Sequence, residues 1–551
     1  MSNDKFVIED TILKEVNKRL RKVEIPEGVT SIAEGVFENC KSLQSIVIPN
    51  SVTSIGEKAF NGCTSLKSVV IPEGVTSIKK EAFRDCTSLE SVIIPNSVTS
   101  IGKSAFAHCS LKSVVIPDSI TSIEEFTFSS SSIESVVIPD SVTSIGESAF
   151  DKCSSLQSVI IPNSVTSIGR SAFNGCTSLE SIVIPDSVTS IAGFTFYYCE
   201  SLESVVIPNS VTSIGQDAFY MCTSLKSVVI PDSVTSIGEE AFDRCSSLQS
   251  VIIPNSVTSI GTRAFAGCSL KSVVIPDSIT SIEESTFSSS RIESVVIPDS
   301  VTSIGNWAFN ENRIKSINIP DSVTFIGRGN FLRCMNLQSV VIPDGVTSIE
   351  PALFSADAAL QSVVIPKSVT SIGQEAFWSC ISLESIDIPD GVTSIGKVAF
   401  CKCSSLQSVV IPDGVTTIEE GLFHHCTSLK SVVIPDSVTS IKKEAFTNCT
   451  SLESIIIPKS VTFIEKQVFE LCTSLKSIVI PEGVPYIGEY LFADCESLES
   501  IVIPESVTSI KKCAFDGCTS LKTINFLGTR NQWKELKLKL DGNIIVKCSD
   551  E

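Results

Sequence analysis

Residues 65–87 read SLKSVVIPEGVTSIKKEAFRDCT, and this phrase returns with small changes along almost the whole chain. Its proline occurs 22 times, from Pro26 to Pro504, and 16 of the 21 intervals between successive prolines are 23 residues while five are 22. A fixed period of this length is typical of a solenoid, in which each repeat contacts only its neighbours. The sequence therefore predicts one long repeat domain in place of the several globular domains that 551 residues would otherwise suggest.

The segment before the proline predicts a strand. Leu66, Val69 and Ile71 form the pattern L-x-x-V-x-I, and alternate residues of a strand face the same side. We therefore expect Val69 and Ile71 to face the core, and Ser68 and Val70 to face outward. The proline ends the strand because it has no N–H group for the ladder.

The segment after the proline predicts a turn, a short extended piece and a loop. We expect Val75 and Ile78 to point inward, Ala82 and Phe83 to return to the core, and Cys86 to lie in the final turn. The Phe position is invariant in all 22 copies, which predicts a large ring that fills the wide side of each turn.

Insertions and deletions locate the loop. In each of the five short copies the missing residue falls between the Phe and the next Leu or Ile. Length changes belong in loops, so this segment is predicted to be one. The position after the inward Ile is often Gly, but it is Lys79, Glu124, Ala192 or Lys511 elsewhere, so no left-handed backbone is required there.

The charge composition limits the classes of partner that the protein can bind. Lys and Arg number 42 and Asp and Glu number 62, for a net charge of −20. This balance argues against nucleic acid or an anionic membrane surface, since both require a basic protein face. We interpret the carboxylates as solvated residues on the repeat edges. No run of about 20 apolar residues predicts a membrane span, and the polar segment Met1–Asp10 lacks the apolar core of a secretion signal.

Eighteen of the 21 cysteines occupy one repeat position, three residues after the Phe. One thiol per repeat is the pattern of a small buried hydrophobic residue, and it differs from the disulfide frameworks of small secreted domains. Other residues replace it at Ser131, Ser290, Asn312 and Asp357. These replacements argue against an obligatory ladder of metal ions.

The sequence offers little catalytic chemistry. Its three histidines are His108, His424 and His425, and a zinc site around the last two lacks the spacing for four ligands. We interpret them as exposed loop residues. Cys401 forms a C-x-C pair with the next column cysteine and is interpreted as a stray surface thiol. No glycine-rich phosphate loop is present. We predict no catalytic residue, no metal site and no cofactor.

The outward strand column is the first candidate site. Val or Ile stands two residues before the proline in 19 of 22 copies. At about 4.8 Å per strand the column spans roughly 100 Å. An exposed apolar stripe marks a contact surface, although β-branched residues also suit strands without any binding role. The candidate residues in this column are Val47, Val70, Ile93, Val115, Val137 and Ile160, with the departures Asn318 and Asp387.

An aromatic cluster is the second candidate site. Phe194, Tyr197, Tyr198 and Tyr220 fall in two adjacent copies, and Tyr197 and Tyr220 occupy the same register, so they should stack. Tyr is favoured in binding hot spots. Drift on an exposed loop explains the cluster equally well.

The phrase I-P-x-x-V-T-x-I-x-x-x-A-F-x-x-C resembles the BspA-type leucine-rich repeat, also called the Treponema pallidum type. The resemblance covers residues 20–526. Residues 5–10 resemble the hairpin that opens such proteins, and residues 525–529, 532–533 and 546–550 resemble their closing segment. We therefore expect an N-terminal cap at 1–19, a repeat solenoid at 20–526 and a C-terminal cap at 527–551.

The resemblance implies a right-handed, curved, mainly β superhelix with a parallel sheet on its concave side. Members of the family are commonly surface or secreted proteins of host-associated bacteria and protozoan parasites, and they are linked to adhesion. It thus implies an adhesin-like protein or a scaffold that binds host or microbial surface proteins. We also predict that the protein is a monomer and not an enzyme. The missing export signal departs from the family, so a cytoplasmic scaffold stays open beside a surface protein.

A threonine column offers a different class of function. Thr fills 21 of 22 positions in one column, broken only at Pro485. Regular Thr columns can match an ice or crystal lattice, whereas hydroxyls beside inward residues favour a structural use. An enzyme hidden in the two ends is discarded, since they are too short for a catalytic domain.

Overall fold

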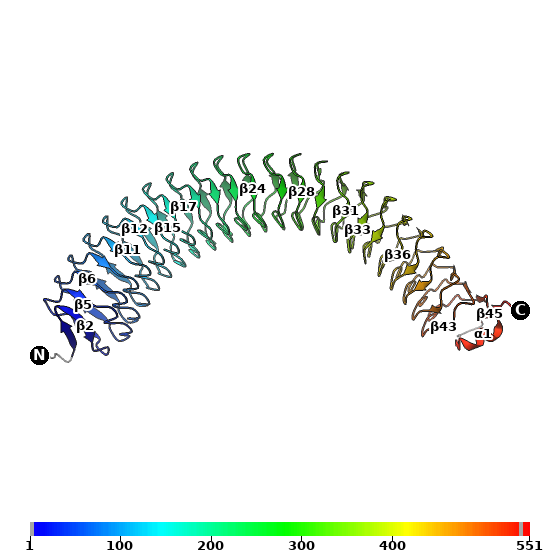
Figure 1. Cartoon of the computed structure of the whole chain (residues 1–551), viewed down its shortest axis with the longest axis horizontal. Coiled ribbons are helices and arrows are strands. Elements are labelled where there is room, and N and C mark those ends of the chain that lie inside the picture. The colour runs from blue at the N-terminus through cyan, green and yellow to red at the C-terminus, as the bar shows by residue number, and fades with distance from the viewer. Residues whose placement is uncertain (1–4, 539–543) are drawn as a thin grey trace. The chain divides into compact units, whose positions relative to one another are not determined.

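The protein is a mainly β repeat solenoid, as the sequence predicts. Its structure, a computed structural model, describes residues 5–538 and 544–551. Residues 1–4 of the expected N-terminal cap and 539–543 of the expected C-terminal cap lie outside the described residues. The chain forms two compact units, Met1–Ser278 and Ile279–Glu551. In each unit, successive turns of chain lie side by side as rungs, one rung per sequence repeat (Figure 1).

Most rungs carry a long strand before the proline and a short strand after it, and at Ser316, Ser385 and Ser454 an isolated bridge takes the place of the long strand. In the first unit the long strands are β3 (Lys22–Glu24), β5 (Ser45–Val47), β7 (Ser68–Val70), β9 (Ser91–Ile93), β11 (Ser113–Val115), β13 (Ser135–Val137), β15 (Ser158–Ile160), β17 (Ser181–Val183), β19 (Ser204–Val206), β21 (Ser227–Val229), β23 (Ser250–Ile252) and β25 (Ser272–Val274). The short strands there are β4 (Ser31–Ile32), β6 (Ser54–Ile55), β8 (Ser77–Ile78), β10 (Ser100–Ile101), β12 (Ser122–Ile123), β14 (Ser144–Ile145), β16 (Ser167–Ile168), β18 (Ser190–Ile191), β20 (Ser213–Ile214), β22 (Ser236–Ile237) and β24 (Ser259–Ile260).

The second unit repeats this arrangement. Its long strands are β27 (Ser294–Val296), β30 (Ser339–Val341), β32 (Ser362–Val364), β35 (Ser408–Val410), β37 (Ser431–Val433), β40 (Ser477–Val479), β42 (Ser500–Ile503), β44 (Thr523–Phe526) and β45 (Ile545–Cys548). Its short strands are β26 (Ser281–Ile282), β28 (Ser303–Ile304), β29 (Phe325–Ile326), β31 (Ser348–Ile349), β33 (Ser371–Ile372), β34 (Ser394–Ile395), β36 (Thr417–Ile418), β38 (Ser440–Ile441), β39 (Phe463–Ile464), β41 (Tyr486–Ile487) and β43 (Ser509–Ile510).

The long strands pair in parallel with the side-chain alternation predicted from the sequence. Ser135, Val136 and Val137 of β13 face Ser158, Val159 and Ile160 of β15, residue for residue. In β7 the inward Val69 is buried between two exposed neighbours, and Ile71 beyond the strand is also buried. A one-residue slip would turn the apolar residues outward, so burial fixes this register.

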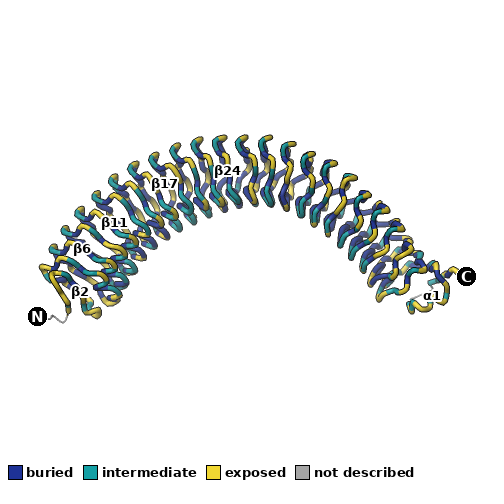
Figure 2. Tube along the Cα trace, viewed as in Figure 1, coloured by how far each residue is buried: buried dark blue, intermediate teal, exposed yellow. Residues whose placement is uncertain are grey.

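The short strands form a second parallel ladder, which the sequence indicated only as an extended piece. Ser77 and Ile78 of β8 pair with Ser100 and Ile101 of β10. The inward positions Val75 and Ile78 are buried, as predicted. The core of each rung therefore lies between the two strands and the Phe loop, and Figure 2 shows buried stretches returning in every turn.

Stacked phenylalanine rings run through the core of each unit. Ring centroids of Phe37 and Phe60 are 4.8 Å apart with planes at 10°, and Phe377 and Phe400 are 5.4 Å apart at 6°. These rings are fully buried, in keeping with the predicted filling of the wide side. Dispersion and offset stacking between neighbours thus add to the burial of each ring.

The column cysteines donate weak hydrogen bonds between rungs. The Cys63 thiol contacts the Phe37 carbonyl at 3.1 Å, and the pattern recurs along both units. All 21 cysteines are free thiols. Burial raises the pKa of Cys199 to about 12, so this thiol stays protonated at neutral pH. The predicted inert core position is therefore confirmed.

The polar substitutes Ser131 and Asn312 keep the same bond. Ser131 Oγ donates to the Phe106 carbonyl at 3.2 Å, and Asn312 Nδ2 donates to the Phe287 carbonyl at 2.8 Å. Ser131 and Asn312 thus supply the donor toward the preceding rung that the thiol supplies elsewhere.

Two loop positions in each rung have a left-handed backbone. One lies two residues before the column Phe and the other two residues after it, as at Glu81 (φ 56°) and Asp85 (φ 59°). The glycine that often follows the inward Ile is not among them, in agreement with the sequence analysis. Non-glycine residues in this region carry a steric cost, so the loop geometry is imposed by the stack.

Different structures close the two ends. At the N-terminal end, a hairpin of β1 (Phe6–Glu9) and β2 (Ile12–Val16) extends the short-strand ladder. Leu13 of β2 pairs with Ile32 of β4 and is fully buried. Beyond β44, helix α1 (Arg530–Glu535) begins at a capping box of Thr529 and Gln532, and β45 follows. No helix among the described residues is long and apolar enough to cross a membrane.

Candidate binding surface

The outward column of the long strands is an exposed apolar ladder. Its Val and Ile side chains from Val47 to Val479 are 56–85% exposed, whereas their inward neighbours are buried. An exposed serine column runs beside it, from Ser45 onward. The predicted outward orientation of Val47, Val70, Ile93, Val115, Val137 and Ile160 is thus confirmed; their binding role stays a prediction. We call these two columns the long-strand face.

A charge-balanced column borders this face one residue before each strand. Glu, Gln and Lys alternate there, and neighbours pair across rungs: Lys226 lies 2.8 Å from Glu203, and Lys476 lies 2.7 Å from Glu453. Exposed pairs of this kind contribute little stability. Their effect on the surface is to neutralise this border locally.

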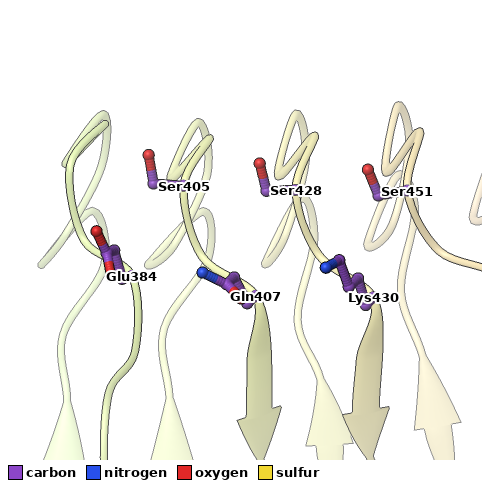
Figure 3. A pocket seen from close by; sticks show the side chains of 6 residues that line it. All are labelled: Glu384, Ser405, Gln407, Ser428, Lys430 and Ser451. Carbon is purple, nitrogen blue, oxygen red and sulfur yellow. The ribbon is translucent and has the colours of Figure 1, made fainter.

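A shallow polar hollow of about 300 Å³ lies along that border in the second unit. Figure 3 shows its two rows of side chains, the hydroxyls of Ser405, Ser428 and Ser451 above the carboxylate, amide and ammonium of successive rungs. The second row consists of Glu384, Gln407 and Lys430. The hollow offers mainly hydrogen-bonding groups, and its one carboxylate and one ammonium group leave it without net charge.

An acidic column borders the other side, directly after each proline. Fifteen of its 22 members are Asp or Glu, five are Asn and two are Lys. The members with carboxylates are Glu27, Glu73, Asp118, Asp140, Asp186, Asp232, Asp277, Asp299, Asp321, Asp344, Asp390, Asp413, Asp436, Glu482 and Glu505. All fifteen are exposed, and among the described residues none forms an ion pair. This border therefore keeps its negative charge.

The acidic column and the apolar ladder line one depression. In the first unit a hollow of about 640 Å³ is bounded by Val115, Val137 and Ile160 together with Asp118 and Asp140. It lies over β11, β13 and β15, where two successive repeats are short. A ligand in this hollow would contact apolar side chains and carboxylates at once.

Asn318 and Asp387 are local breaks in the ladder. Their rungs carry no long strand, and each is joined to the next rung by a single bridge, Ser316 to Ser339 and Ser385 to Ser408. The rung of the apolar Ile456 likewise has only a single bridge, so the missing strand does not depend on the polar side chain, but Asn318 and Asp387 place no apolar group in the column. Both therefore interrupt the apolar surface without contributing to it.

The aromatic candidates form a separate cluster on the Phe loop. The rings of Tyr197 and Tyr220 stack at 4.8 Å and 13°, which confirms the prediction from their shared register. Tyr198 lies edge-on to Tyr197 at 4.6 Å, and Phe194 packs on Tyr197 at 5.3 Å. All four are half-buried, not exposed. They lie in loops and not on the long-strand face, so the two candidate sets are distinct.

The electrostatics of the cluster reflect burial. Burial raises the pKa of Tyr197 to about 12. Burial, followed by the charge of Glu240, raises the pKa of Asp217 to about 6. The guanidinium of Arg170 lies 4.1 Å above the Phe194 ring. These contacts give the cluster a structural role of its own within the stack.

The histidine and cysteine expectations have mixed outcomes. His424 and His425 stack with ring centroids 4.3 Å apart and are partly buried, which differs from the predicted exposed residues. Burial also lowers the pKa of His424. The prediction that Cys401 is a surface thiol is wrong, because the residue is buried. Trp378 occupies the same column one rung earlier and contacts Cys401, and burial raises the pKa of this thiol to about 11. In the described part of the chain no group of three His, Cys, Asp or Glu side chains suits a metal ion.

The exposed threonine column uses its hydroxyls in hydrogen bonds between neighbouring rungs. Thr53 Oγ1 donates to the Thr30 carbonyl at 3.1 Å, and Thr235 Oγ1 donates to the Thr212 carbonyl at 3.1 Å. The same bond recurs in later rungs and continues where Thr508 bonds to the Pro485 carbonyl. The sequence left two alternatives for this column, lattice binding and a structural use, and these contacts are the structural use.

The sequence reasoning did not identify the acidic column as part of a site. It interpreted the carboxylates as solvated edge residues. The signal was present, since Asp, Glu or Asn follows 20 of the 22 repeat prolines. Their joint border with the ladder became visible only when the turn geometry was known.

Stacked rungs with two parallel strand ladders, a Phe column and a Leu-led strand motif define a leucine-rich repeat solenoid. The family model described as "BspA type Leucine rich repeat region (6 copies)" matches residues 8–133, 121–248, 212–338, 326–453 and 439–536. The chain therefore belongs to the BspA-type leucine-rich repeat family, as the sequence resemblance indicated. No curated protein matches the chain.

Solved structures of leucine-rich repeat proteins are similar to the chain. One from Bacteroides ovatus is 22% identical over 98% of this chain and 94% of its own, with a TM-score of 0.28. One from Eubacterium ventriosum is 25% identical over 62% of this chain and 90% of its own, with a TM-score of 0.38. The Treponema pallidum protein is 26% identical over 40% and 86%, with a TM-score of 0.28. At such TM-scores these likenesses add nothing to the family match.

Proposed function

We propose that this protein is a non-enzymatic protein-binding solenoid, adhesin-like or a scaffold, and that its partner contacts the long-strand face. The observation that carries the proposal is the exposed Val and Ile ladder. Soluble proteins rarely leave a contiguous apolar surface of this extent open to water. A bound partner would remove it from water and gain roughly 25 cal/mol for each Å² of apolar area buried.

The repeat design suits this function. Rungs that contact only their neighbours can be added without a change in the core, and each adds a further unit of binding surface. Leucine-rich repeat solenoids are typically non-enzymatic, and a long regular face favours macromolecular partners over small molecules. The aromatic cluster around Tyr197 is a second, smaller candidate for the same function.

Paired variants test the proposal. The strand-face variant replaces Val115, Val137 and Ile160 with Asn, the residue found naturally in this column at Asn318. The loop variant replaces Tyr197, Tyr198 and Tyr220 with Ser. Each immobilised protein captures partners from cell-surface extracts of microbes and of host cells, and mass spectrometry identifies them. We expect partners of the parent protein to be lost from the strand-face variant and retained by the loop variant.

Circular dichroism and thermal unfolding will check that both variants remain folded. Retention of every partner by the folded strand-face variant would refute the proposed surface. Loss from the loop variant alone would move the site to the aromatic cluster.

A further inference from the structure

We propose that the long-strand face binds a basic amphipathic helix that lies along the columns, with its apolar side on the Val and Ile ladder and its Lys and Arg residues on the acidic column. The inference rests on the proposed function and names the partner's chemistry. The inference is based on one arrangement, found in each unit: an acidic column, without ion pairs in the part of the chain that the structure describes, lies beside the exposed Val and Ile ladder.

The two borders of the face differ in charge. On the border before the strands, Lys and Glu of successive rungs meet, as in Lys112 with Glu90 at 3.8 Å and Lys522 with Glu499 at 3.6 Å. On the other border the exposed carboxylates form no ion pair among the described residues. A partner therefore encounters a neutral rim, an apolar centre and a negative rim.

The acidic rim carries an electrostatic cost that a cationic partner removes. Where carboxylates stand on adjacent rungs about 4.8 Å apart, each pair repels by roughly 1 kcal/mol in water. Asp390, Asp413 and Asp436 form such a run of three in the second unit, and Asp118 and Asp140 form one of two in the first. Counter-ions screen this repulsion in solution, and bound Lys or Arg side chains would replace them.

The hollow in the first unit shows that one ligand can reach both features. Val115, Val137 and Ile160 share its lining with Asp118 and Asp140. A Leu or Ile side chain on the ladder and an ammonium group at the rim can therefore come from the same short segment. Long Lys and Arg side chains suit this task because their stems pack on apolar surface while the charge reaches the rim.

The spacing of the ladder favours a helix over an extended chain. Rungs repeat at about 4.8 Å, and an α-helix advances about 5.4 Å per turn. A helix along the columns thus stays near register for about three turns. Same-side residues of an extended chain repeat at roughly 6.6 Å, so they leave register after one rung. The match selects a helix with apolar residues at i, i+4 and i+7 and a basic flank.

Three synthetic peptides test the inference on the full chain. The first is a helical peptide of about 18 residues with a Leu stripe flanked by Lys. The second keeps the stripe but has Glu in place of Lys. The third is the Lys peptide with a central Pro, which breaks the helix. We expect the Lys peptide to bind, with affinity that falls as salt rises, and we expect the other two to bind at least about tenfold more weakly.

Matched variants locate the charge effect. One carries Asp118, Asp140 and Asp186 replaced by Asn and Glu73 replaced by Gln, four carboxylates within six successive rungs that a helix of about 18 residues can span. The control carries Glu134, Glu180, Glu293 and Glu384 on the opposite border replaced by Gln, for the same change in net charge. Four surface ion pairs together correspond to about tenfold in affinity. We expect that loss in the first variant and a change below twofold in the control.

The outcomes separate this inference from the proposed function. Equal binding of the Lys and Glu peptides, or equal losses in the two charge variants, would overturn the acidic rim as the determinant. Equal binding of the Pro peptide would assign the face to an extended basic chain and overturn the helix. If all three peptides fail while the strand-face variant still loses its captured partners, the proposed function stands and this inference falls.

Discussion

Asp357 places a carboxyl group in a column that otherwise holds thiols, hydroxyls or an amide. It is fully buried, its Oδ1 accepts a bond from the Cys334 amide at 2.6 Å, and its Oδ2 has no hydrogen-bond partner. Burial raises the pKa of Asp357 well above the usual range, which favours the protonated carboxyl group in the native protein. This single residue therefore makes stability depend on pH.

We predict that Asp357→Cys and Asp357→Asn stabilise the protein at neutral pH. The native pKa is raised, so the contribution of Asp357 is fully favourable below the unfolded pKa near 4 and is lost as pH rises toward the native pKa. The difference in unfolding free energy between variant and parent should thus grow by about 1.4 kcal/mol per pH unit above pH 4. Urea unfolding at pH 3.5, 5 and 7 measures it. A constant difference would contradict the argument.

Val398 is strained for a different reason. Its φ is 49°, a region that β-branched residues rarely occupy. Gly421 holds the same position one rung later with φ 60°, and a Cβ added there would lie 2.8 Å from Val398 Cγ1. The valine is accommodated because its neighbour has no side chain.

We predict that Val398→Gly raises stability by about 0.5–1 kcal/mol because it removes this strain, and that Gly421→Ala lowers stability by about 1 kcal/mol or more. In the double variant the loss at position 421 should shrink, since the obstructing methyl group is gone. Thermal unfolding of the four proteins gives the coupling energy. Additive effects would show that the two rungs do not interact at this position.

Among the elements, the terminal strand β45 has a protected edge. The Ile545 amide bonds to the Lys522 carbonyl, so the backbone groups of Val546 point away from β44. The Arg530 guanidinium donates to the Val546 carbonyl at 2.8 Å and pairs with Glu551. Helix α1 thus covers an edge that could otherwise add a strand from another chain.

We predict that Arg530→Ala increases self-association, because it exposes that carbonyl. Size-exclusion chromatography with light scattering should show a larger share of assemblies than the parent at equal concentration, with a small fall in Tm. Lys534→Ala, on the same helix, is the control and should behave as the parent. Equal behaviour of the two variants would show that Arg530 does not protect the edge.

The sequence predicted the long strands well because burial on one side leaves a period of two, as in Val69 and Ile71. It predicted the Phe ladder because a ring of fixed size suits one position in every turn. It did not predict the left-handed loop positions, since residues as varied as Glu81, Phe126 and Val398 occupy them. The glycines at Gly329 and Gly421 were the available signal, diluted by those other residues.

The acidic rim could not be derived from a single repeat. Asp118 and Val115 are three residues apart with a proline between them, and only the turn geometry brings both to one hollow. Cys401 was misjudged for a related reason, because its cover comes from Trp378 in another rung. Contacts between rungs depend on which residues are neighbours in the stack, and one repeat does not contain that information.

At the scale of the whole molecule the two ends are unequal. In the first rung Phe37 and Cys40 are buried, and Lys18 bonds to the Glu38 carbonyl at 2.8 Å. In the last rung Ile510, Phe515 and Cys518 are partly exposed, although their counterparts elsewhere are buried. In a solenoid each rung is stabilised by its neighbours, so the less covered end should open first.

Thiol labelling can test this order, because most rungs carry a cysteine. We predict that, among the column cysteines, pulses of a maleimide at pH 8.5 in rising urea label Cys518 first and Cys495 next, while Cys40 at the other end stays protected to higher urea. Labelling requires the thiolate, and burial raises the pKa of Cys518 to about 12 and that of Cys40 to about 11, so the order reports on opening and not on acidity. Mass spectrometry of the peptides gives the labelled fraction at each site, and protein in guanidinium chloride, where all 21 thiols should react alike, is the control. Simultaneous labelling of Cys40 and Cys518 would mean that the hairpin gives the first rung no extra protection.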